Sequence, residues 1–414
     1  MISVLELLNT PLEYLFSLEH FGIKFGLDNM LAIVERLGHP ERAFRTIHIA
    51  GTNGKGSVTA MIDQALIADG YRSARYTSPH LTRLEERFAV GGHPVERGAL
   101  VAAVADVRDV VDSLRADGVL DTHPTFFEVT TAVAFELFRR AAVDIAVLEV
   151  GLGGRLDATN VVSPVVTAIT SIGLDHQQYL GSTLRDIAGE KAGIIKAHVP
   201  VVVGEMDPEA LEVIAAIARA READLIRTSA ADAAHLSIGL AGRHQVGNAA
   251  VAVRVLDVLT TCGIPVTPRA KAAGIADAKW PGRLDLRRLP DGREVLLDAA
   301  HNPAGAAALA SYLHGLDSPL PLVFAAMRDK DAAGMFRALA GAIDRLVLTR
   351  ASSRRAAEPE ALAAIARQVA PQLSLDVVPV AADALEAAWR TSPRIIVAGS
   401  IFLLGDVMER FGWS

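Results

Sequence analysis

The chain has 414 residues and a mass of 43.8 kDa, more than one ordinary hydrophobic core holds, so the length favours two domains. The net charge of −7 and the pI near 6.0 argue against a nucleic-acid-binding surface. The single cysteine, Cys262, excludes an intramolecular disulfide framework and a cysteine-based zinc cluster.

The first twenty residues do not read as a signal peptide. They lack a cationic leader and place Glu6, Glu13 and Glu19 among their apolar residues. No uninterrupted apolar stretch of about 18 residues occurs, so we expect no membrane span. The sequence therefore predicts a cytoplasmic protein without a membrane or nucleic-acid partner, which we expect to be a monomer.

Strand-like and helix-like runs alternate along the chain in two series, which predicts an α/β fold with two domains. The strand-like runs of the first series lie at 45–50, 72–77, 144–150, 165–169 and 199–204. Those of the second, smaller series lie at 294–298, 321–326, 345–350, 375–378 and 394–398. Between them, proline, glycine and charged residues cluster at 278–294, and we place the domain boundary there, with domains at 1–283 and 284–414.

Residues 51–57, GTNGKGS, form a glycine-rich turn between a strand-like run and a helix-like run. Backbone N–H groups at such a junction can surround phosphate oxygens at the positive end of the helix. Lys55 could reach the outer phosphates and the Ser57 hydroxyl could face a magnesium ion. The loop departs from the common G-x-x-x-x-G-K-[ST] pattern, because Gly56 separates the lysine from the hydroxyl. The alternative is a chance Gly-Lys-Gly turn.

Three further stretches place polar residues where a strand ends, at the sheet edge where open α/β sheets bind ligands. Glu149 begins the loop EVGLGGRLDATN and is a candidate magnesium ligand, or else a structural partner. Asp175 and His176 follow the next strand, where a histidine is more often a structural hydrogen-bonding residue. In the second series, Asp298, His301 and Asn302 crowd a turn before a helix. Asn302 before Pro303 resembles a helix N-terminus, and the alternative to a functional role for these residues is a simple helix cap.

Nine motifs, in this order, closely resemble the folylpolyglutamate synthase and dihydrofolate synthase family, and they span almost the whole chain. They are GTNGKGS, YTSPHL at 76–81, EVGLGGRLDATN at 149–160, LDHQQYLG at 174–181, EKAGIIK at 190–196, GRHQVGNAA at 242–250, WPGR at 280–283, DAAHNP at 298–303 and AGSIFL at 398–403. The resemblance implies an N-terminal P-loop domain of the Mur ligase type and a smaller, C-terminal Rossmann-like domain that close over ATP.

The resemblance also implies roles for individual residues. Lys55, His176 and Lys191 would be catalytic, with Lys191 carbamylated. The residues implied to bind ATP are Thr52, Asn53, Gly54, Lys55, Gly56, Ser57, Gln245, Asn248, Arg283, Asp298 and His301. Magnesium, as two ions, would be held by Ser57, Ser78, Glu149 and His176. The pterin of the substrate would contact Thr125, Phe127 and Asp157, with Arg83 as a further candidate.

The implied activity is ATP-dependent addition of L-glutamate through an acyl phosphate, to dihydropteroate and to the glutamate tail of reduced folates. A synthase acting only on reduced folates is the first alternative. A Mur ligase of peptidoglycan synthesis would need a further N-terminal domain, and only about 50 residues precede the loop. A non-catalytic nucleotide-binding protein would need the phosphate loop but not the other implied site residues.

Overall fold

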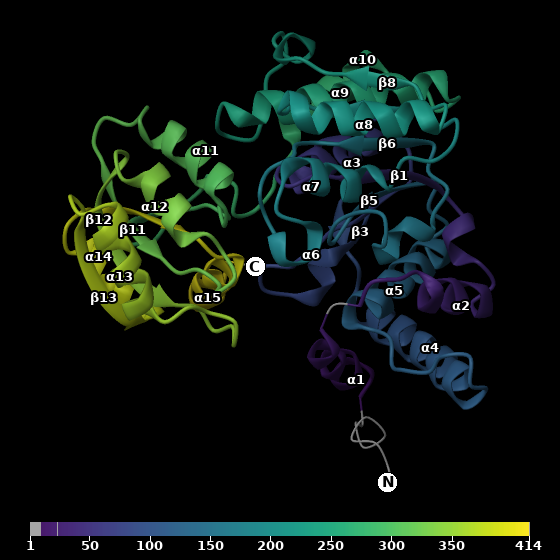
Figure 1. Cartoon of the computed structure of the whole chain (residues 1–414), viewed down its shortest axis with the longest axis horizontal. Coiled ribbons are helices and arrows are strands. Elements are labelled where there is room, and N and C mark those ends of the chain that lie inside the picture. The colour runs from purple at the N-terminus through teal and green to yellow at the C-terminus, as the bar shows by residue number, and fades with distance from the viewer. Residues whose placement is uncertain (1–9, 23, 414) are drawn as a thin grey trace.

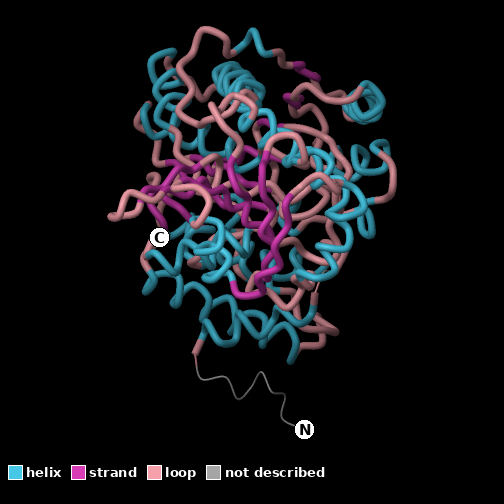
Figure 2. The backbone as a smooth tube through the Cα atoms, turned by 90° about the vertical axis from the view of Figure 1, so that its left-hand side faces the viewer, coloured by secondary structure: helices cyan, strands magenta, loops and turns pink. Residues whose placement is uncertain are grey.

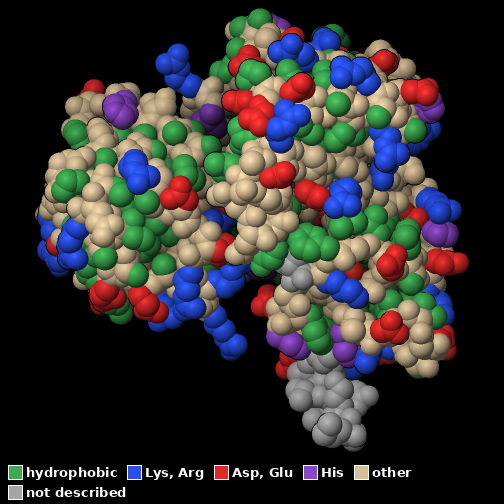
Figure 3. Space-filling view, viewed as in Figure 1, with side chains coloured by type: hydrophobic (Ala, Val, Ile, Leu, Met, Phe, Trp, Pro, Cys, Tyr) green, Lys and Arg blue, Asp and Glu red, His purple; other side chains and the backbone are tan. Residues whose placement is uncertain are grey.

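A computed structural model describes residues 10–22 and 24–413, and in it the chain forms two bodies that lie side by side (Figure 1). Each body is built on its own sheet, with the strands inside and helices outside, as Figure 2 shows from the side. The expectation that the first twenty residues are not a signal peptide rests partly on residues 1–9, which lie outside the described residues. Charged side chains of both signs are scattered over the face in Figure 3.

The first sheet has eight strands in the order β4-β3-β2-β5-β1-β6-β7-β8. All neighbours pair in parallel except β2 with β3 and β3 with β4. The strands are β1 (Arg45–Ala50), β2 (Ser73–Tyr76), β3 (Phe88–Val90), β4 (His93–Pro94), β5 (Ile145–Glu149), β6 (Val166–Ile169), β7 (Val201–Val203) and β8 (Leu225–Arg227).

Helices cover both faces of this sheet because alternate side chains of its buried strands point to opposite sides. Ile47 and Ile49 of β1 pack into a core with α3 (Lys55–Ala68), α9 (His244–Thr261) and α10 (Pro268–Asp277). The other face is covered by α4 (Arg97–Ala116), α5 (Phe126–Arg140), α7 (Leu184–Ala192) and α8 (Pro208–Ala220). The shorter helices α1 (Pro11–Ser17) and α2 (Asp28–Arg36) pack beside α4 and α5, and α6 (Gln177–Leu180) follows β6.

The second sheet has six strands in the order β13-β12-β11-β14-β10-β9, parallel except for β9. Its strands are β9 (Asp285–Arg288), β10 (Glu294–Leu297), β11 (Leu320–Phe324), β12 (Ile343–Arg350), β13 (Ser374–Val380) and β14 (Arg394–Ala398). One face packs against α11 (Pro303–Leu313), α12 (Ala332–Leu339) and α13 (Pro359–Val369), and the other against α14 (Ala381–Trp389) and α15 (Ile401–Phe411).

The observed fold confirms the predicted α/β class, and every strand-like run predicted from the sequence overlaps a strand. Four strands were not predicted: β3, β4, β8 and β9, each only two to four residues long. The change of sheet falls between Asp277, where α10 ends, and Asp285, where β9 begins. Among the helices that the structure describes, none has the length and the apolar run needed to cross a membrane.

Candidate active site

The candidate site lies where β1, β5 and β6 end, in the middle of the first sheet. β1 lies between β5 and β6, and all three run in parallel, so the loops that follow them leave the same edge. These loops carry the phosphate-loop residues 51–57, the Glu149 carboxylate and the Asp175–His176 pair. The chain runs from β1 to β2 on one side of this point and from β5 to β6 on the other. Because the connections from the neighbouring strands β1 and β5 leave in opposite directions, the edge forms the crevice in which such sheets bind ligands.

The phosphate loop is fixed by hydrogen bonds to the residues that follow β6 and by close packing against α9. Thr170 Oγ1 donates to the carbonyl of Asn53 at 2.6 Å, and the Asn53 amide donates to Ser171 Oγ at 3.1 Å. Gly54 has a φ of 87°, and a Cβ atom there would lie 2.3 Å from Asn248 Oδ1, so only glycine fits. α3 begins at Lys55 with its first N–H groups directed at this loop.

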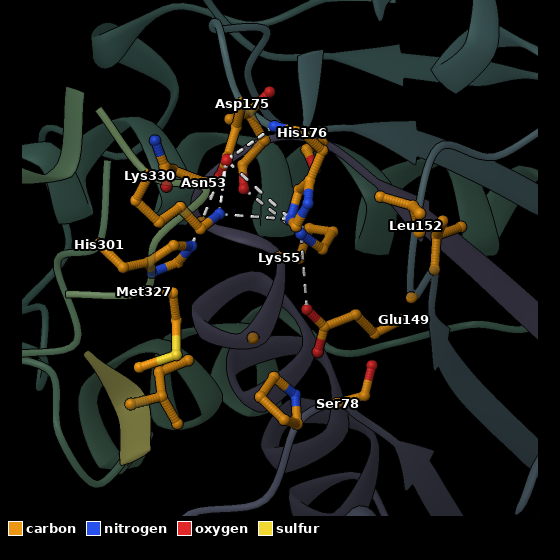
Figure 4. Close-up of a pocket in the computed structure, with 18 of the residues that line it drawn as sticks. Asn53, Lys55, Ser78, Glu149, Leu152, Asp175, His176, His301, Met327 and Lys330 are labelled. Carbon is orange, nitrogen blue, oxygen red and sulfur yellow. Dashed lines mark hydrogen bonds and ion pairs between the residues drawn. The ribbon is translucent and has the colours of Figure 1, made fainter. Parts of the chain in front are cut away.

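The Lys55 ammonium is folded back over the loop and faces Glu149 (Figure 4). Lys55 Nζ donates to the carbonyls of Gly51 at 3.0 Å and Thr52 at 3.4 Å, and it lies 3.8 Å from Glu149 Oε1. Burial raises the pKa of Glu149, while the charges of Lys55 and Arg283 oppose this. The predicted position of Glu149 at the end of a strand is confirmed, since it is the last residue of β5.

Lys191 is a buried lysine in the last turn of α7, 6% exposed, and it lines the same cavity as Lys55. Burial, with a smaller contribution from the charge of Lys55, lowers its pKa to about 7. A large fraction of the amine is therefore neutral near pH 7. Its neighbour Glu190 faces outward and pairs with Arg155 at 2.8 Å. A Glu-Lys pair is typical of a solvated helix face, yet here the lysine, Lys191, lines the cavity.

Asp175 joins the two bodies of the molecule. Its carboxylate accepts from Lys330 Nζ at 2.5 Å and from Asn302 Nδ2 at 3.1 Å, and it lies 3.5 Å from His301 Nε2. Burial raises the pKa of Asp175, but the contact with His301 and the charge of Lys330 outweigh it and hold that pKa well below its usual range. Asn302 also exchanges hydrogen bonds with the Asn53 side chain, so the phosphate loop is tied directly to the second body.

His176 adopts a left-handed backbone conformation, with a φ of 52°, which is uncommon for a residue with a side chain. Its amide donates to Asp175 Oδ1 at 2.8 Å, and its Nε2 lies 3.4 Å from Lys330 Nζ. Burial and the charge of Lys330 lower the pKa of His176 to about 4. The ring is therefore neutral near pH 7 and presents a lone pair, as a metal ligand requires.

One cavity of about 290 Å³ is lined by most of the predicted catalytic and phosphate-binding residues, and we call it the catalytic cavity after that prediction. Its lining includes Thr52, Asn53, Gly54, Lys55, Gly56, Ser78, Glu149, His176, Lys191, Arg283 and His301. A second cavity of about 430 Å³, on the other side of the loop, is lined by Ser57, Gln245, Asn248, Arg283 and Asp298. Arg283 borders both cavities, so one cation from the segment between the bodies reaches both parts of the candidate site.

The residues predicted to hold the pterin are placed differently. Thr125 and Asp157 both cap helical segments, accepting from the amides of Glu128 at 3.2 Å and Thr159 at 3.1 Å. The Phe127 ring lies directly against Gly151, where a Cβ atom would come within 2.4 Å of it. Neither of the two cavities above is lined by these three residues. Arg83 lines a third cavity, of about 590 Å³.

Sequence reasoning left Lys330, Arg355 and Ser400 unassigned, although all three line the catalytic cavity. Lys330 and Ser400 each follow a strand of the second sheet at its carboxyl end, after β11 and β14. The rule that ligands bind at that edge, which pointed to Glu149, could therefore have pointed to both. Arg355 likewise follows the carboxyl end of a strand, in the loop between β12 and α13, so the same rule could have pointed to it.

Two domain models of the Mur ligases match the chain. The Mur ligase middle domain matches residues 49–236, and the Mur ligase glutamate ligase domain matches residues 282–401. With the phosphate loop, the second sheet and the site between them, the chain is a Mur ligase, the class of enzymes that form amide bonds with ATP. It belongs to the folylpolyglutamate synthase and dihydrofolate synthase family within that class.

Three similar proteins illustrate the relationship. The dihydrofolate synthase/folylpolyglutamate synthase of Mycobacterium tuberculosis is 35% identical over 441 residues, covering 93% of this chain and 90% of the relative. The structure of Escherichia coli FolC with DHPP and ADP has a TM-score of 0.85 at 32% identity and covers 98% of both chains. A bifunctional folylpolyglutamate synthase/dihydrofolate synthase with Mn, AMPPNP and L-glutamate bound has a TM-score of 0.84 at 30% identity, also covering 98% of both chains.

Proposed function

We propose that this enzyme attaches L-glutamate both to dihydropteroate and to the glutamate tail of reduced folates, using ATP. The observation that carries the proposal is the convergence of Lys55, Glu149, His176 and Lys191 on one cavity, which Lys330 of the second body also lines. The relatives add support, because one structure holds DHPP and ADP and another holds L-glutamate and a nucleotide analogue.

ATP would lie across the phosphate loop. Its outer phosphates would meet the loop amides of 52–57 and Lys55 in the catalytic cavity, with Arg283 and His301 approaching from the other side. The nucleoside would occupy the cavity lined by Gln245, Asn248 and Asp298. Asn248 suits a positioning role there, since its side chain lies against Gly54 and donates to Gln245 Oε1 at 2.8 Å.

The donor atoms in the site fit magnesium. Glu149 offers a carboxylate, Ser57 and Ser78 offer hydroxyls, and His176 offers a neutral imidazole. No group of three His, Cys, Asp or Glu side chains that could hold a metal occurs among residues 10–22 and 24–413. That absence fits an ion bound largely by substrate phosphates and water, as magnesium usually is. When bound, two such ions would neutralise phosphate charge.

Lys191 suits the proposed carbamate because the reaction with carbon dioxide needs a neutral amine. A pKa of about 7 supplies that form near neutral pH, whereas an ordinary lysine would be almost wholly charged. The carbamate would convert a buried cation into an anion close to Lys55, whose positive charge already acts on Lys191. The pair would then attract rather than repel.

The chemistry needs two steps. An oxygen of the acceptor carboxylate attacks the γ-phosphorus of ATP, and the bond from this phosphorus to the oxygen of the β-phosphate breaks. ADP departs, and an acyl phosphate remains. The neutral amine of glutamate then attacks the acyl carbon, the carbon–oxygen bond to phosphate breaks, and the amine loses a proton as the amide forms. Since the oxygens around the phosphorus carry negative charge, the cations Lys55, Arg283 and Lys330 would stabilise the transition state together with the bound magnesium.

Thr125, Phe127 and Asp157, with Arg83, are the residues proposed to contact the pterin. The aromatic face of Phe127 and the carboxylate of Asp157 suit a flat heterocycle that donates hydrogen bonds. We further propose that residues 1–283 and 284–414 form the two domains, which agrees with the change of sheet. The protein would act as a monomer in the cytoplasm, and the low cysteine content supports this choice of compartment.

The test is ADP release with ATP, magnesium, a folate acceptor and L-glutamate. We expect release to require both the acceptor and glutamate, and Lys55→Ala to lose turnover while its unfolding temperature stays near that of the wild type. Lys24→Ala is the control for loss of a lysine, since Lys24 contacts Thr122 and Asn29 away from the catalytic cavity. Near wild-type turnover by Lys55→Ala would contradict the proposed role of the loop.

A further inference from the structure

The phosphate loop has a glycine where the common pattern has none, and the structure shows what lies against it. The indole of Trp280 packs onto the first turn of α3 at Gly56. A Cβ atom at Gly56 would lie 2.8 Å from Trp280 Nε1, 2.9 Å from Cε2 and 3.0 Å from Cζ2. Contacts this short do not occur between real side chains, so any larger residue would have to displace the ring.

The ring is partly buried and lines the third cavity, and neighbours on the first body hold it in place. The Arg75 guanidinium lies 5.5 Å from the centre of the Trp280 ring, within the range of a cation–π contact. Arg75 is itself fixed by a 2.7 Å ion pair with Asp63, which is fully buried on α3. Asp63 also accepts from Ser73 Oγ at 2.6 Å. Trp280 further packs against the core formed by α3, α9 and α10.

Trp280 begins the segment that leads from the first body to the second, and the other end of that segment is tied down as well. The amide of Ala299 donates to the carbonyl of Gly282 at 2.8 Å, and the amide of Leu284 donates to Asp298 Oδ2 at 3.0 Å. Arg283 therefore lies between an anchor on α3 and an anchor on the second body. It borders the catalytic cavity, the second cavity proposed to hold the nucleoside, and the third cavity.

We propose that Trp280 is a positioning residue that docks the inter-domain segment on the phosphate-loop helix and so sets Arg283 against the bound nucleotide. Gly56 is required for this contact, because the absence of a side chain at Gly56 makes room for the indole. The inference rests on the proposed function, since it takes ATP as the ligand of the loop. It explains why the loop reads GKGS, and it links the position of the second body to the phosphates.

The test is a double-mutant cycle on ADP affinity, measured by calorimetry with magnesium, which needs no turnover. Gly56→Ala is expected to weaken ADP binding about tenfold, the effect of overpacking a fixed contact. Trp280→Ala is expected to weaken it about tenfold through the loss of a charged hydrogen bond from Arg283. The double variant is expected to bind within about threefold of Trp280→Ala, because the clash is gone, whereas independent effects would give about a hundredfold loss.

Two further variants separate positioning from general stability. Trp280→Phe keeps a flat ring and is expected to restore ADP affinity to within about threefold of the wild type. Trp389→Ala is the matched control, since Trp389 also lies under an arginine, Arg293 at 4.2 Å, but in the second body. It is expected to lower the unfolding temperature without changing ADP affinity.

Unchanged affinity in Gly56→Ala or in Trp280→Ala, or a multiplicative loss in the double variant, would overturn the inference while leaving the proposed function intact. Failure of the wild-type protein to bind ADP would overturn both.

Discussion

Lys330 Nζ lies 2.5 Å from Asp175 Oδ1, and this ion pair joins the loop after β11 to the loop after β6. Both side chains are 8% exposed, so the pair is shielded from water where the two bodies meet. The contact stands beside His176 and above the phosphate loop (Figure 4). It places the second body over the site in which the reaction would occur.

Replacing Lys330 is expected to slow turnover. Lys330→Met leaves the buried Asp175 carboxylate short of its main counter-charge and weakens the closed arrangement, so we expect kcat to fall about tenfold or more. Lys271→Met is the matched control, because Lys271 pairs with Asp257 at 2.6 Å within the first body. Steady-state kinetics of both variants make the comparison, and wild-type turnover by Lys330→Met would contradict the account.

Lys191 is expected to carry a carbamate whose formation depends on pH. Because burial lowers the pKa of this amine to about 7, its neutral form is abundant above that pH and is lost below it. Carbamate and turnover are therefore expected to fall together as the pH drops through about 7. A carbamate signal in NMR spectra after incubation with ¹³C-bicarbonate reports on this directly.

The control for this experiment is a half-buried lysine of the same segment. Lys196 donates to the carbonyl of Asn160 at 2.8 Å and lies outside the catalytic cavity lining. The carbamate signal is expected to vanish in Lys191→Arg and to remain in Lys196→Arg. A signal that persists in Lys191→Arg would place the modification elsewhere.

His48 is expected to weaken the fold in acid. It is fully buried, and burial together with the charge of Lys196 lowers its pKa to about 3. Below about pH 6.5, His48 takes up a proton in the unfolded chain but stays neutral in the folded chain. The free energy of unfolding therefore falls as the pH drops below about 6.5. This histidine alone would contribute a slope of about 1.4 kcal/mol per pH unit in the free energy of unfolding.

Denaturant unfolding of the wild type and of His48→Gln between about pH 4 and 7 measures this slope. The variant is expected to show a shallower pH dependence, while His93→Gln, which alters an exposed histidine, keeps the wild-type dependence. Parallel curves for the wild type and His48→Gln would show that His48 is not the group responsible.

Asp157 is expected to matter for the fold as well as for the substrate. Its carboxylate accepts from the amides of Leu152 at 2.8 Å and Thr159 at 3.1 Å and from Thr159 Oγ1 at 2.5 Å. In Asp157→Asn, an NH₂ group would face donors, at a cost of about 1–3 kcal/mol in the free energy of unfolding. Unfolding curves test this; a variant as stable as the wild type would show that these hydrogen bonds are dispensable.

Much of the first sheet and its catalytic edge could be predicted because the signals are local. The alternation of 45–50 predicted β1 with its observed bounds, and the end of the apolar run predicted the position of Glu149. Asn302 before Pro303 was interpreted as a helix start, and its side chain does accept from the Gly305 amide at 2.8 Å. Each of these features depends on a few neighbouring residues, so the sequence contains it directly.

Other parts of the site depend on contacts between distant segments. Nothing local distinguishes the buried Lys191 from the half-buried Glu190 beside it, because their burial is decided by the loop of Arg155 that packs against α7. The pairing of Asp175 with Lys330 joins residues far apart in the chain. The strands β3, β4 and β8 have too few residues to show an alternation and are formed through pairing with their neighbours.

The most direct test of the central claim is to offer the purified enzyme, with ATP, magnesium and L-glutamate, 7,8-dihydropteroate in one reaction and tetrahydrofolate in another. ADP release is measured together with the mass of the product. We expect turnover of both acceptors, each gaining one glutamate per ADP released. Turnover of tetrahydrofolate alone would contradict the bifunctional assignment. If neither acceptor led to ADP release, the proposed function as a whole would be contradicted.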